Sequence, residues 1–264
     1  MLRNRFQKEM EALNLELTQM AALIEKIISD GTKALINQDK SLCEQVISHR
    51  DEVKIARAEI ESKALKIILM QQPVAGDLRK ISTALKMITD LERIASQARD
   101  ICEIVLFLCG ENYQVIQTPE QALDTPSYDG VIDSKAAEFE SGLRQKNALA
   151  SKHFSSSFQI NLEILPQMGD KARQMVFDCV NSFVKQDLEL AEKTIEDDNQ
   201  LDALFDKLRK KMIKLIKEKP SFADQAIYLL MIGKYLEKIG DHAENIAQWV
   251  IYSKTGKHKN IKII

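Results

Sequence analysis

The chain contains two copies of one segment, and this internal repeat constrains the fold more than any other feature. Residues 90–101 and 235–246 align at an offset of 145 and are identical at five of twelve positions. A second echo lies at an offset of 148, where Gln38-Asp39 matches Gln186-Asp187. The repeat predicts that one supersecondary unit is built twice, because each copy needs a neighbour to cover its apolar face.

Apolar residues spaced three and four apart predict long amphipathic helices in both halves. Only nine glycines and five prolines interrupt the 264 residues, which also favours helices. The expected helices span about 4–38, 40–70 and 76–108, and then about 165 onward, 187–217 and 221 onward, with breaks at Pro73 and Pro220. Short connections require antiparallel neighbours. The expected fold class is all-α, with six long helices forming two tandem three-helix bundle repeats.

The expected domain organisation follows from where the copies begin and end. The first repeat is assigned to residues 1–109 and the second to residues 158–264. Residues 110–157 match neither copy and contain glycine, proline and serine clusters, so we expect a long connection that is partly disordered or carries a short helix. The second repeat ends in a basic tail with Lys254, Lys257, His258, Lys259 and Lys262.

Charge and hydropathy exclude several function classes. A formal net charge of −2 gives no electrostatic reason to expect nucleic acid as a partner. No signal peptide and no apolar run of the ~20 residues that span a membrane is found, so a cytoplasmic protein is expected. The cysteines are expected to be small buried hydrophobes and not zinc ligands; they are Cys43, Cys102, Cys109 and Cys179.

The second repeat carries two pairs of acids, and each pair is four residues apart on one helix face. In an antiparallel hairpin turning near Pro220, Asp202 lies opposite Glu237 and Asp198 lies opposite Asp241. Four converging carboxylates repel one another unless a cation neutralises them, and their oxygens suit Mg, Mn, Ca or oxidised Fe. The acids could instead form an ordinary solvated helix face.

The neighbours of these four acids, and the first-repeat positions that correspond to the acids, also bear on whether a metal ion binds. His242, Glu244 and Asn245 could extend the site. The corresponding first-repeat positions are Arg50, Lys54, Glu92 and Ser96. Two cations and one acid need no metal, and Lys54 with Glu92 could form a surface ion pair of about 0–1 kcal/mol.

Three stretches resemble the PhoU family, regulators of bacterial phosphate uptake; they are residues 71–79, 90–94 and 236–246. The resemblance implies a six-helix cytoplasmic protein that restrains phosphate uptake and the phosphate-starvation response. It also implies contact with the ATPase of the phosphate ABC transporter and with a sensor histidine kinase, and through them a peripheral association with the membrane. A homodimer is a further expectation.

The resemblance also implies a metal ion, with Fe, Mn, Mg and Zn as candidates, bound by Glu/Asp-x3-Asp motifs. These motifs match Asp198, Asp202, Glu237 and Asp241, and they match Glu92 only in part, because Ser96 stands where the motif has aspartate. We therefore expect a non-enzymatic negative regulator that binds metal. The alternatives are a carboxylate-bridged metalloenzyme, whose usual Glu-x2-His motif is missing from this sequence, and a metal-free helical scaffold.

Overall fold

The computed structural model describes residues 2–110, 163–258 and 261–262. Its helices are α1 (Leu2–Asn37), α2 (Lys40–Ser48), α3 (Arg50–Gln71), α4 (Ala75–Leu108), α6 (Ile164–Lys185), α7 (Leu188–Glu218) and α8 (Ala223–Thr255). A 3-10 turn, η1 (Pro220–Phe222), joins α7 to α8, and strands β1 (Lys257–His258) and β2 (Ile261–Lys262) pair antiparallel after α8. The predicted all-α fold is confirmed.

The second predicted helix differs from the observed one, because it is divided into α2 and α3 at His49. The ring Nδ1 of His49 lies 2.7 Å from a carboxylate oxygen of Glu52, which is in the first turn of α3. Val46 and Val53, seven residues apart, are buried on the two sides of the break. The apolar spacing thus continues across His49, and no proline or glycine stands there, so the break could not be predicted from the local sequence.

The second echo in the sequence is a repeated turn. Gln38 and Gln186 adopt the left-handed conformation, with φ of 54° and 55°. The side chains of Asp39 and Asp187 then accept hydrogen bonds from the backbone N–H groups three residues later, at 3.0 and 3.1 Å. These bonds satisfy N–H groups that have no partner within the new helix. Each half therefore begins its second helix with the same cap.

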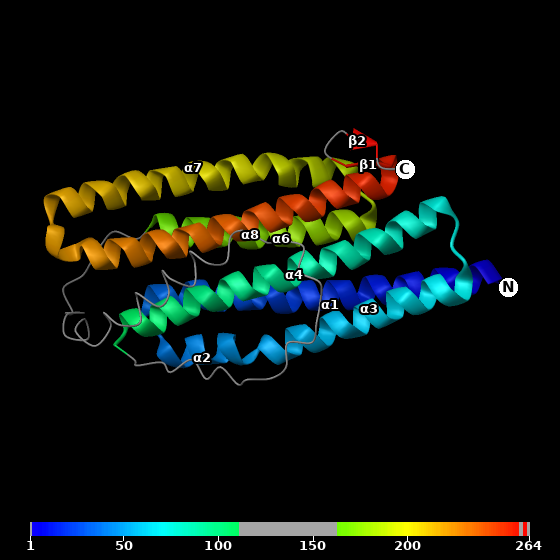
Figure 1. Cartoon of the computed structure of the whole chain (residues 1–264), viewed down its shortest axis with the longest axis horizontal. Helices are drawn as coiled ribbons and strands as arrows, with labels where there is room; N and C mark the ends of the chain where they lie inside the picture. The colour runs from blue at the N-terminus through cyan, green and yellow to red at the C-terminus, as the bar shows by residue number, and fades with distance from the viewer. Residues whose placement is uncertain (1, 111–162, 259–260, 263–264) are drawn as a thin grey trace, which may run out of the picture.

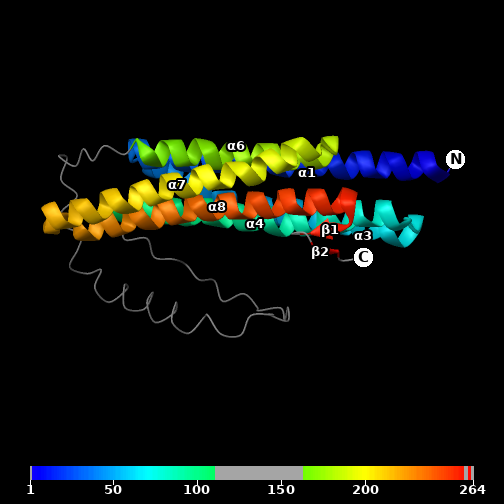
Figure 2. The ribbon, with the colours of Figure 1, turned by 90° about the horizontal axis from the view of Figure 1, so that it is seen from above.

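One apolar core includes residues from both halves, such as Leu17 and Ile94 from the first and Met175 and Ile239 from the second. Contacts of α4 with α8 and of α1 with α6 join the halves. Figures 1 and 2 show an elongated bundle whose helices run along its long axis. The turn between α3 and α4 lies at one end and the turn between α7 and α8 at the other (Figure 1).

The expectation for the cysteines is confirmed at three positions. Cys43, Cys102 and Cys179 are buried, whereas Cys109 is half-buried near the end of α4, and none of the four forms a disulfide within the described residues. No helix in the described part of the chain is long and apolar enough to cross a membrane.

The connection expected at 110–157 lies, except for Gly110, outside the described residues, as does Lys259 of the basic tail. Lys254 lies in the last turn of α8, whereas Lys257 and His258 form β1 and Lys262 belongs to β2. The His258 ring lies 4.0 Å from the Trp249 ring of α8, measured between centroids.

Candidate cation site between α7 and α8

Two glycines on α8 allow it to approach α7 closely. A Cβ atom at Gly240 would lie 2.4 Å from Cδ2 of Leu201 and 2.9 Å from Oδ1 of Asp198. A Cβ atom at Gly233 would lie 2.2 Å from Cδ2 of Leu208. A side chain at either position would therefore require the facing side chains of α7 to shift or the two helices to move apart.

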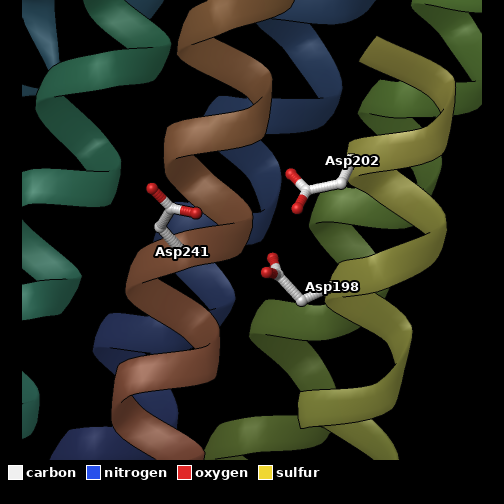
Figure 3. Close-up of side chains that lie close together, drawn as sticks. All are labelled: Asp198, Asp202 and Asp241. Atoms are coloured by element: carbon white, nitrogen blue, oxygen red, sulfur yellow. The ribbon is translucent and has the colours of Figure 1, made fainter. Parts of the chain in front are cut away.

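Three aspartates meet across this contact. One carboxylate oxygen each from Asp198, Asp202 and Asp241 can be chosen so that all three lie within 4.8 Å of one another. Figure 3 shows Asp198 and Asp202 on α7 directed toward Asp241 on α8. Asp202 is exposed and the other two are half-buried, so the cluster lies on the flank of the bundle and not in its core. The predicted facing of Asp198 and Asp241 is confirmed.

Asp198 is the member of the cluster whose negative charge is least stabilised by its surroundings. Its Oδ1 is buried and has no hydrogen-bond partner among the described residues. Burial and, in decreasing order of effect, the negative charges of Asp202, Asp241, Glu244 and Glu237 together raise the pKa of Asp198 to about 7. A cation held by the three carboxylates would supply the missing partner and neutralise the repulsion. Because all the donors are hard oxygens, these residues suit Mg, Mn, Ca or oxidised Fe better than zinc.

Glu237 does not join the three aspartates, although the hairpin arithmetic placed it with them. Its Oε1 accepts a hydrogen bond from Lys234 at 2.7 Å, and Lys238 lies 3.7 Å from its Oε2. Lys238 also donates to Asp241, and this hydrogen bond raises the pKa of Lys238. Two lysines on α8 thus compete with any cation for the site. These ion pairs could have been predicted from the sequence. Lys234 lies three residues before Glu237, and Lys238 lies three residues before Asp241, so each lysine shares a helix face with its acid.

His242 and Asn245 point away from the cluster, and the expectation that they extend it was wrong. The His242 ring Nδ1 lies 2.9 Å from one carboxylate oxygen of the buried Asp90 on α4, and the Asn245 amide donates to the other oxygen at 2.7 Å. This polar group instead joins α4 to α8, and hence the two halves. Of the three residues that were expected to extend the site, Glu244 is the one whose charge acts on Asp198.

Glu92 lies in the first repeat, apart from the acid cluster. It forms an ion pair with Arg57, and not with Lys54 as the sequence suggested. Arg50, Lys54, Glu92 and Ser96 nevertheless line one cavity, so the predicted facing of these positions is confirmed. Within the described residues, the three aspartates form the single group of three or more acids, histidines or cysteines close enough to share an ion.

Comparison with known proteins identifies relatives along nearly the whole chain. The family model described as "PhoU domain" matches residues 17–105 and 165–250. A phosphate-specific transport system accessory protein PhoU homolog from Clostridium acetobutylicum is 29% identical, covering 99% of each chain. A protein of the same description from Aquifex aeolicus is 30% identical, covering 97% of this chain and 96% of its own.

Solved structures give the same result for the fold. PhoU from Pseudomonas aeruginosa superposes with a TM-score of 0.72 at 25% identity, covering 96% of this chain and 100% of its own. The phosphate transport system regulatory protein PhoU from Streptococcus pneumoniae gives a TM-score of 0.73 at 21% identity, covering 96% and 98%.

Proposed function

The chain belongs to the PhoU family, and we propose that it is a negative regulator of phosphate uptake and of the phosphate-starvation response. The family is one of accessory proteins of phosphate transport and not of enzymes, so the proposed role is non-catalytic. The observation that carries the proposal is similarity over almost the full length of homologues described as phosphate transport accessory proteins.

The regulator would act as an adaptor between the ATPase of the phosphate ABC transporter and a sensor histidine kinase, and would reach the membrane through these partners. An accessory protein must contact the transport machinery that it serves, and the ATPase is the part of an ABC transporter on which restraint of uptake would act directly. A separate proposal is that the adaptor is a homodimer, and its mass in solution would test this.

The regulator would also bind a cation at Asp198, Asp202 and Asp241, with Glu237 and Glu244 at the edge. Support comes from the buried Oδ1 of Asp198, which lacks a partner in the described structure, and from the raised pKa of this carboxyl. Fe, Mn and Mg fit the oxygen donors, and Zn fits less well. Glu92 has no part in this site, because Arg57 already neutralises it.

Titration of chelator-treated protein with Mn²⁺, followed by calorimetry, tests the cation site. We expect replacement of Asp198 and Asp241 by asparagine to weaken binding by at least about tenfold, because two of three charged ligands are lost. The matched control is Asp206→Asn, which removes an equal charge from an exposed position on α7 that pairs with Arg209. Wild-type protein that takes up no Mn²⁺, Fe or Mg²⁺, or binds them as weakly as the double variant, would contradict the cation site.

The regulatory role is tested in a strain that lacks the protein. With phosphate in excess, we expect a reporter of the phosphate-starvation response to be active without the protein and to be silenced when the wild-type chain is restored. The purified chain should also capture the transporter ATPase and the kinase. A reporter that stays silent in the deletion strain, or a chain that captures neither partner, would refute the regulator.

A further inference from the structure

The first repeat contains a cavity of about 230 Å³ where the second repeat has its acid cluster. It lies beside the break between α2 and α3, and its polar lining comes from His49, Arg50, Lys54, Glu92, Ser96 and Arg99. A cavity of roughly 150 Å³ already accepts a benzene molecule, so there is room here for a small ion with some of its water.

The charge of this lining is positive. Arg50, Lys54 and Arg99 each contribute one cation, whereas Glu92 is the single acid, and Arg57 pairs with it. Arg99 also pairs with Asp100 and Glu103 at 3.1 and 3.3 Å. In contrast, Arg50 and Lys54 form no ion pair with any residue that the structure describes. The charge of Arg50 does act on Glu103, where it partly offsets the rise in pKa that burial causes, but neither basic group nearest the break is held in an ion pair by a described residue, so both can turn toward an anion.

The repeat relation explains how such a site arises. The positions of Arg50 and Lys54 correspond to Asp198 and Asp202 at an offset of 148, and Ser96 corresponds to Asp241 at an offset of 145. Three positions that are acidic in the second hairpin are thus basic or neutral in the first. The same side-chain convergence that brings three carboxylates together between α7 and α8 presents hydrogen-bond donors between α3 and α4.

We infer that this cavity is a binding site for a phosphate-type oxyanion. A guanidinium group can donate two parallel hydrogen bonds to such an anion, and an ammonium group adds a compact charge. Arg50 and Lys54 supply these groups from α3, and the Ser96 hydroxyl supplies a neutral donor from α4. Glu92 does not repel the anion strongly, because its charge is shared with Arg57. The inference is independent of the cation site and of the proposed regulatory role.

Isothermal titration with inorganic phosphate tests the inference, with chelator present so that no metal ion can hold the phosphate elsewhere. The wild-type chain should bind one phosphate. Lys54→Glu should weaken binding by at least about tenfold, because it replaces an attraction by a repulsion, and Arg50→Gln should weaken it severalfold. Lys54 and Arg50 are exposed, and circular dichroism should show that both variants keep their helices.

The matched control is Lys66→Glu, which makes the same charge reversal at an exposed position on α3 that does not line the cavity. Its affinity should stay within about twofold of the wild type. Sulfate should compete with phosphate, which would identify the oxyanion shape as the recognised chemistry. Three results would each overturn the inference: no phosphate binding by the wild-type chain, unchanged binding by folded Lys54→Glu, or an equal loss in Lys66→Glu.

Discussion

Asparagine in place of Asp198 should stabilise the metal-free protein at alkaline pH, although it removes a candidate ligand. The folded protein holds this carboxyl at a pKa of about 7, mainly through burial, whereas its ordinary value is 3.8. Ionising Asp198 therefore costs more free energy in the folded state than in the unfolded state. The contribution of this residue to the free energy of unfolding is fully present at a pH below its ordinary pKa, and it is lost as the pH rises through about 7.

The size of the effect follows from this difference in pKa. The interval from 3.8 to about 7 corresponds to about 4 kcal/mol. We halve this to about 2 kcal/mol, because the site lies on the flank of the bundle, where water screens charge. An asparagine side chain has nearly the shape of aspartate and cannot ionise, so Asp198→Asn should recover this free energy at about pH 8 and little of it at about pH 4.5.

The measurement is the free energy of urea unfolding in the presence of chelator, at both pH values. Asp206→Asn, at an exposed position on α7, should change it by less than about 0.5 kcal/mol. Saturating Mn²⁺ should reverse the order of stability, because a ligand that binds the folded state of the wild type more tightly stabilises the wild type more. If Asp198→Asn were destabilising in chelator at pH 8, or if its effect did not depend on pH, ionisation of Asp198 would not cost free energy in the folded protein and the prediction would be wrong.

Five further substitutions test how the bundle is held together. Gly240→Ala should destabilise by about 1–3 kcal/mol in urea unfolding, because its Cβ would meet side chains of α7. Gly76→Ala, whose Cβ has no neighbour within 4 Å, should stabilise slightly, and equal effects of the two changes would contradict the close approach. Asp90→Ala should cost about 1–3 kcal/mol and increase hydrogen exchange along α4 and α8, because the half-buried His242 and Asn245 lose their hydrogen-bond partner. Unchanged exchange would argue against this link between the halves. Asp39→Ala and Asp187→Ala should each cost about 1 kcal/mol by thermal unfolding, and a negligible effect of both would dismiss the shared cap.

Local chemistry was enough to predict much of the fold. The breaks at Pro73 and Pro220, the apolar spacing and the two Gln-Asp turns depend on residues close in sequence, so they could be inferred without the structure. The placement of Asp198 opposite Asp241 was also predictable. Both residues lie at similar distances from one turn, and a helix rises by a fixed 1.5 Å per residue.

The sequence by itself determined which side chains share a helix face and a height in each hairpin. Only the tertiary structure decided which partner each side chain takes. Glu237 pairs with lysines of its own helix, Glu92 pairs with Arg57, and His242 turns to Asp90 on a helix of the other half. The physical reason is that helix geometry depends on residues close in sequence. A side chain, in contrast, can adopt several rotamers, and each rotamer brings it near a different charged group. That choice depends on packing against residues far away in the chain.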